Sequence, residues 1–185
     1  LGLIDAQGNH RSYVGPYELS AKNYKDQEWF EEVTLRGMFV SDVFMGFRKF
    51  PHFVIAIKHE KANGDFYVLR ATLNTEILNN KIHSLIYWPQ SDAFLINNEG
   101  ILQTESRFYG NILNKYPLKI PRFTPNAVVK PEYDAEGNTN ILGYAYIDHS
   151  PFILIVTKQS VDFMANLFKI RNRLMWFLGI SIIII

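Results

Sequence analysis

The sequence predicts an α+β protein built from two stacked modules, each with an antiparallel sheet. The first observation is a repeat: residues 3–8 (Leu-Ile-Asp-Ala-Gln-Gly) recur as residues 95–100 (Leu-Ile-Asn-Asn-Glu-Gly). Each copy reads as the apolar end of a strand, an Asx residue and a Gly, which is typical of a hairpin turn. The second observation is that each half closes with a long hairpin rich in Val, Ile, Phe and Tyr, turning at Gly64 and at Gly137.

The elements of the first half follow in order from these signals. Residues 26–36 predict an amphipathic helix with Asp26 as N-cap, acids in its first turn and Gly37 at its end. A strand is expected at 38–44, then the hairpin 53–58 and 66–73, then a helix that begins after Asn74 and Thr75.

The second half repeats this order. Strands are expected at 141–147 and 152–157, separated by the break at Ser150 and Pro151, and a helix follows Ser160. We therefore expect one module at residues 1–88 and a second at 89–165. Residues 166–185 are expected to form a juxtamembrane helix and the start of a truncated transmembrane helix.

The membrane prediction rests on residues 174–185, a run of about 12 residues without a charged side chain. A helix that spans a membrane needs roughly 20 such residues, so the run is interpreted as the start of a truncated span. The alternative is a C-terminal helix buried in a core. Lys169, Arg171 and Arg173 precede the apolar run, and by the positive-inside rule they favour a cytoplasmic location for that side, against an extracytoplasmic domain.

Composition excludes several classes of chemistry. The absence of Cys excludes a disulfide scaffold, thiol catalysis and Cys-ligated zinc, and a formal net charge of +1 gives no support to nucleic-acid binding. The five His residues lack metal-ligand spacing, and neither a Gly-x-Ser-x-Gly elbow nor a Gly-rich phosphate loop is present. We expect no catalytic residue, no metal and no cofactor in this stretch.

Two segments of the first half carry a resemblance to a known family. Residues 24–33 (Tyr-Lys-Asp-Gln-Glu-Trp-Phe-Glu-Glu-Val) and 37–44 (Gly-Met-Phe-Val-Ser-Asp-Val-Phe) resemble the helix and strand of the membrane-distal module of a double Cache domain. Residues 94–100 are similar to the opening of its membrane-proximal module. The resemblance implies PAS-like modules and a long N-terminal helix that this sequence lacks.

The resemblance also implies a function. Double Cache domains are periplasmic or extracellular sensors of bacterial receptors in the inner (cell) membrane, so it implies a small-molecule ligand in the first module, membrane attachment and a homodimer. Residues 70–74 and 103–106 are most similar to the histidine kinase branch, and thus to a two-component system. The alternatives are a methyl-accepting chemotaxis protein, a diguanylate cyclase, and a ligand-free dimerisation module.

The candidate ligand site combines aromatic and charged residues of the first half. Trp29 and Phe30 form either the core or an aromatic pocket wall. Arg70 lies in an apolar strand, where its charge needs water, an internal carboxylate or a carboxylate ligand. The predicted ligand-binding residues are Trp29, Phe30, Ser41, Asp42, Phe44, Arg48, His52 and Arg70.

The nature of the ligand is narrowed by one comparison with the family. The amino-acid-binding members have an Arg two residues before the Trp, where this chain has Gln27, and they have a ligand-gripping Asp near the position of Ala71. The amino-acid signature is therefore absent. We expect an anionic or zwitterionic ligand of unnamed identity.

Overall fold

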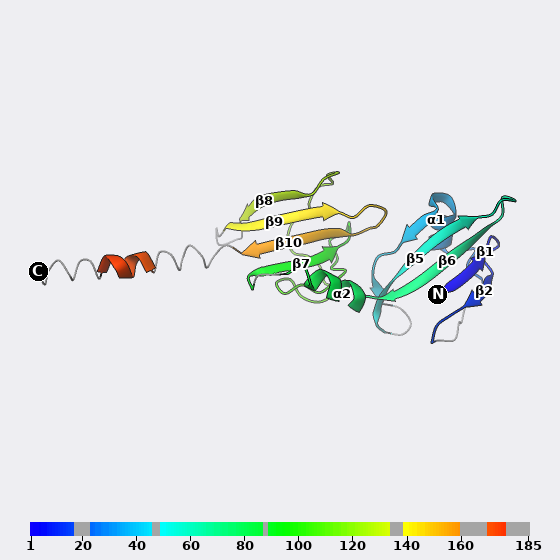
Figure 1. Cartoon of the computed structure of the whole chain (residues 1–185), viewed down its shortest axis with the longest axis horizontal. Helices are drawn as coiled ribbons and strands as arrows, with labels where there is room; N and C mark the ends of the chain where they lie inside the picture. The colour runs from blue at the N-terminus through cyan, green and yellow to red at the C-terminus, as the bar shows by residue number, and fades with distance from the viewer. Residues whose placement is uncertain (17–22, 46–48, 87–88, 134–138, 160–169, 177–185) are drawn as a thin grey trace, which may run out of the picture.

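The chain forms two antiparallel sheets that lie end to end, with helix α2 beside the second (Figure 1). This computed structural model describes residues 1–16, 23–45, 49–86, 89–133, 139–159 and 170–176. The α+β class that the sequence predicts is confirmed, because each sheet is antiparallel and the named helices are few and short.

The first sheet has strand order β2-β1-β6-β5-β3, and the short strand β4 also pairs with β5. Its strands are β1 (Gly2–Asp5), β2 (His10–Tyr13), β3 (Met38–Val40), β4 (Phe44–Met45), β5 (Pro51–Glu60) and β6 (Phe66–Asn74). The hairpin β5–β6 turns at Gly64, whose φ of 83° requires the left-handed region that glycine tolerates.

Helix α1 (Glu28–Arg36) contacts β3 and β5 on one face of this sheet. It buries Phe30 and Val33, and it ends at Gly37, whose N–H donates to the Val33 carbonyl. The N-cap is Gln27 rather than the predicted Asp26, and no side-chain hydrogen bond caps this end.

The predicted strand 38–44 is wrong in one respect, because it is broken into β3 and β4. Ser41 Oγ accepts a hydrogen bond from the Val54 N–H at 2.8 Å. The Val43 N–H donates to Gln103 Oε1 at 2.6 Å. The backbone of Val43 therefore bonds to the second half of the chain instead of continuing the ladder of the first sheet.

The second sheet has strand order β7-β10-β9-β8. It comprises β7 (Ser91–Ile96), β8 (Val128–Tyr133), β9 (Thr139–Tyr146) and β10 (Ile153–Gln159), and α2 (Glu76–His83) connects the two sheets. Strand β8 precedes the turn predicted at Gly137, although no bounds were predicted for it. It contains Pro131, which cannot donate to a ladder. It lies at the edge of the sheet, where proline is tolerated.

The repeat appears as the same turn at the end of β1 and of β7. Asp5 Oδ1 accepts hydrogen bonds from the N–H groups two and four residues later, and Asn97 Oδ1 does the same. The third residue after each, Gly8 and Gly100, has φ of 80° and 73°. The Asx side chain and the glycine thus fix both turns in one geometry.

The buried apolar side chains of the described residues gather into three cores. One lies beneath α1, one lies on a single face of the second sheet, and the third lies where the sheets meet. The buried members of this junction core are Val43, Phe53, Ile82, Ala93, Leu95 and Phe152. The two sheets therefore share buried apolar surface.

The predicted C-terminal segment falls largely outside the described residues, which omit 160–169 and 177–185. Residues 170–176 are helical. Of the helices within the described ranges, none combines the length and the apolar character needed to cross a membrane.

Candidate functional site

Arg70 lies on the α1 face of β6, surrounded by aromatic rings. Its guanidinium carbon is 5.1 Å from the ring centre of Trp29 and 5.6 Å from that of Tyr24. These two rings meet edge-on, with centres 5.4 Å apart. The His10 ring lies 5.9 Å from Tyr24 and 6.0 Å from Tyr13. We call these five residues, Arg70, Trp29, Tyr24, His10 and Tyr13, the Arg70 cluster.

The sheet leaves room for the cluster because the strand neighbours of Arg70 are small. Gly2 and Ala56 are its cross-strand partners on either side. A Cβ added at Gly2 would lie 2.6 Å from His10 Nε2, so glycine is required for the imidazole to approach. Larger side chains at these two positions would fill the space that the guanidinium and the rings occupy.

Arg70 has no anionic partner within the described part of the chain. It forms no salt bridge or hydrogen bond there, and its Nε is buried without an acceptor. Burial lowers the pKa of Arg70 below its usual value, and the acidic groups that act against this are the phenols of Tyr24 and Tyr13. Ring contacts stabilise a cation only in part, so the cluster is a candidate site for an anion.

The same surroundings act on His10. Burial, followed by the positive charge of Arg70, lowers the pKa of His10 below its usual 6.5. The imidazole is therefore predominantly neutral at pH 7. It becomes a second cation beside Arg70 on acidification.

The structure brings together three of the predicted ligand-binding residues. Trp29 touches Arg70, and Phe30 contacts Trp29 edge-on with ring centres 5.7 Å apart. Phe30 is only 4 % exposed and packs with Val33 in the core under α1. It therefore positions the Trp29 ring and does not itself face solvent or a ligand.

Four other predicted residues lie nearer the junction. The Ser41 hydroxyl accepts a hydrogen bond from the backbone of β5. The Asp42 carboxyl lies beside Asn97 and Glu99 of the second half. Loss of water around Asp42 raises the pKa of its carboxyl, and the charge of Glu99 adds to this while the bond to Asn97 opposes it.

Phe44 and His52 are cross-strand partners with ring centres 4.4 Å apart. His52 is four residues from Ala56 along β5, which corresponds to about 13 Å from the row of Arg70. The predicted residue Arg48 lies outside the described residues. The predicted set is thus divided between the Arg70 cluster and the junction.

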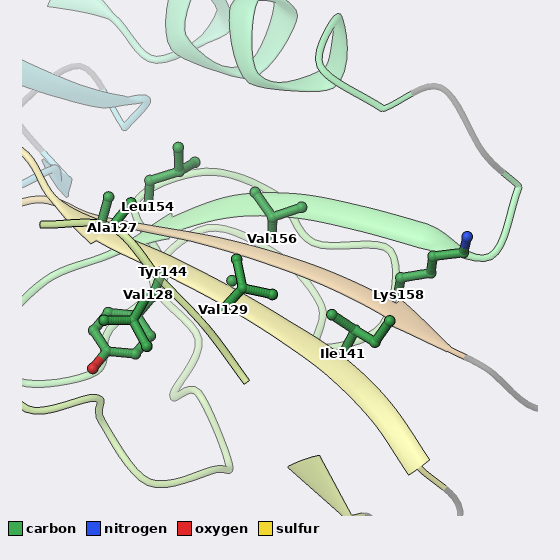
Figure 2. A pocket seen from close by; sticks show the side chains of 10 residues that line it. Ala127, Val128, Val129, Ile141, Tyr144, Leu154, Val156 and Lys158 are labelled. Carbon is green, nitrogen blue, oxygen red and sulfur yellow. The ribbon is translucent and has the colours of Figure 1, made fainter. Parts of the chain in front are cut away.

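A second candidate is an apolar groove of about 280 Å³ on the outer face of the second sheet. Leu154 and Val156 project into it from β10, whereas Tyr144 points to the opposite side of the sheet (Figure 2). Among the described residues that line it, Lys158 is the one that carries a charge. The groove lacks the convergent polar groups that orient a small polar ligand.

Solved structures similar to this chain include the extracellular domain of a histidine kinase and the ligand-binding domains of chemoreceptors. One is the extracellular domain of a protein described as a histidine kinase, rpHK1S-Z16, with 16% identity, a TM-score of 0.60, and coverage of 86% of this chain and 69% of that one. Another is the ligand-binding domain of the Pseudomonas aeruginosa amino acid chemoreceptor PctB in complex with L-Gln (16%, 0.61, 94% and 75%). A third is that of PctC with GABA (14%, 0.62, 85% and 74%).

This chain has the double Cache fold. No family model and no curated protein sequence matches it, so the fold is established by structure. In this double Cache fold the Arg70 cluster lies on the first sheet under α1, and three of its members, Tyr24, His10 and Tyr13, were not predicted. Their signal in the sequence is weak, because only the register of β2, β1 and β6 brings Tyr13 into line with Arg70.

Proposed function

We propose that this chain is the extracytoplasmic small-molecule sensing domain of a bacterial transmembrane receptor. The observation that carries the proposal is a half-buried cation, Arg70, that is lined by aromatic rings and has no anion among the described residues. The solved examples of this fold, which bind small ligands in PctB and PctC, support it. In this proposal residues 1–88 form the ligand-binding module and residues 89–165 the membrane-proximal module.

We further propose that the receptor is a sensor histidine kinase and that the domain acts as a homodimer. Residues 166–185 would form the juxtamembrane helix and begin the membrane span, with the domain in the periplasm or outside the cell. The histidine kinase neighbour supports this choice. The chemoreceptor neighbours favour the second candidate, a methyl-accepting chemotaxis protein. The gene sequence that follows Ile185 decides between them, because each receptor class has a different output domain.

The ligand-binding function is tested by a thermal-shift screen of carboxylates, amines, amino acids and sugars against the wild-type chain and Arg70→Met. A ligand present at 100 times its dissociation constant adds about 2.7 kcal/mol to the free energy of unfolding. We expect at least one compound to stabilise the wild type and not Arg70→Met. A screen in which no compound of any class stabilises the wild type would favour a ligand-free dimerisation module instead.

A further inference from the structure

Among the described groups that act on the charge of Arg70, none is a carboxylate, since the two acidic groups that do so are the phenols of Tyr24 and Tyr13. Arg70 is positive and His10 is the other ionisable base beside it. The neighbours of Arg70 on the same face of β6 are Val68 and Thr72, and neither side chain carries a charge that could pair with the guanidinium. The helix α1 presents Trp29, Phe30 and Val33 toward this region, again without a charge.

Four carboxylates of the first half of the chain form ion pairs with cations other than Arg70. The pairs are Asp5 with Arg11 at 2.7 Å, Glu32 with Arg36 at 2.8 Å, Glu60 with Lys58 at 2.7 Å and Asp65 with Lys61 at 3.1 Å. Asp42, a predicted ligand-binding residue, lies at the junction instead. These carboxylates are therefore engaged away from Arg70, and no described carboxylate acts on the charge of its guanidinium.

We propose that the site takes a carboxylate ligand that lacks an ammonium group, and that it discriminates against the corresponding amino acid. This rests on the proposed sensing function and specifies its ligand class. The carboxylate binds the Nη end of Arg70, which is the part of this half-buried side chain that a ligand can reach. The apolar body of the ligand packs against the rings of Tyr24 and Trp29.

The discrimination follows from two costs that an ammonium group would meet. It would lose water without gaining a carboxylate partner, which is unfavourable for any buried charge. It would also lie near the positive charge of Arg70, and near that of His10 when protonated. Both costs are absent for a ligand whose single charge is negative.

The test uses pairs of compounds that differ by the ammonium group: propionate and alanine, butyrate and 4-aminobutyrate, 3-phenylpropionate and phenylalanine. Dissociation constants are measured by calorimetry on the whole 185-residue chain. We expect at least one carboxylate to bind, and to bind about tenfold or more tightly than its amino-acid partner, because each tenfold step corresponds to about 1.4 kcal/mol. An amino acid that binds as tightly as, or more tightly than, its paired carboxylate would overturn the ligand class while leaving the sensing function intact.

Three variants link the result to the cluster. Arg70→Met is expected to abolish carboxylate binding. Arg70→Lys keeps the positive charge and a similar bulk, so it serves as a second variant if Arg70→Met does not fold, and it is expected to weaken carboxylate binding. Thr72→Asp places a carboxylate next to Arg70 on the same strand face and should weaken carboxylate binding as well. Arg36→Met removes an exposed cation from the end of α1 and serves as the control, with unchanged affinity.

Two results separate the failure of this inference from that of the proposed function. Carboxylate binding that persists in Arg70→Lys and Thr72→Asp at the wild-type dissociation constant would overturn the site. A panel in which no carboxylate binds, while an amine or a sugar does, would overturn the ligand class and keep the sensing function. The absence of binding by every compound of all classes would overturn both.

Discussion

Replacing Gln103 with Leu tests the polar contact that joins the two halves of the chain. Gln103 is fully buried, accepts the Val43 N–H at 2.6 Å and donates to the Ile101 carbonyl at 3.1 Å. Leu has nearly the same size and no polar atoms. The substitution therefore leaves the N–H of Val43, a residue only 4 % exposed, without an acceptor.

The expected cost is set by that orphaned N–H group. A buried donor that loses its partner destabilises a protein by roughly 1–3 kcal/mol. We take about 2 kcal/mol, and since 1 kcal/mol lowers the melting temperature by about 2–4 °C for a chain of this size, Gln103→Leu should melt roughly 4–8 °C below the wild type.

Differential scanning calorimetry measures this effect, with Gln159→Leu as the matched control. Gln159 has an exposed side chain at the end of β10, so its replacement should change the melting temperature little. If Gln103→Leu melted within about 1 °C of the control, the hydrogen bond across the junction would contribute no stability and the reasoning would be wrong.

Three further predictions concern single residues. Because the pKa of His10 is lowered in the folded state, the unfolded state takes up the proton first. The free energy of unfolding should then fall as the pH drops from about 6.5 toward that lowered pKa, and His10→Gln should flatten this part of the profile in urea titrations. Asp92 is fully buried and accepts the Ser106 hydroxyl at 2.6 Å, so Asp92→Ala should cost about 2–3 kcal/mol in urea unfolding and Ser106→Ala less. Gly37 has a φ of 80° with no atom within 4 Å of an added Cβ, so Gly37→Ala should cost about 1 kcal/mol from backbone strain alone, and a calorimetric value near zero would contradict this.

Local signals were the ones that the sequence expressed reliably. The turn after Asp5 and that after Asn97 were predicted from an Asx and a glycine, and the structure shows the same hydrogen bonds in both. The end of α1 at Gly37 followed from the same kind of short-range rule. Such features depend on residues within one turn of each other, so the pattern contains all the information needed.

Features that depend on distant partners were not predicted. The strand expected through Ser41 is interrupted because Val43 bonds to Gln103, sixty residues away in sequence. The Arg70 cluster likewise depends on the register of β1 against β6, which brings Tyr13 and His10 to the same place. Ser41 and Asp42 were predicted to share a site with Arg70, but Ser41 bonds to the backbone of β5 and Asp42 lies beside Asn97 of the second half.

The junction core has a consequence for how the chain unfolds. Val43 and Phe53 from the first sheet pack with Leu95 and Phe152 from the second, and the rings of Phe53 and Phe152 meet with centres 5.9 Å apart. Neither half completes its own apolar surface, since each supplies part of the other's covering. The chain should therefore unfold in a single cooperative transition. A fragment that ends before β7 should expose the apolar surface that the second sheet normally covers, and it should self-associate through that surface.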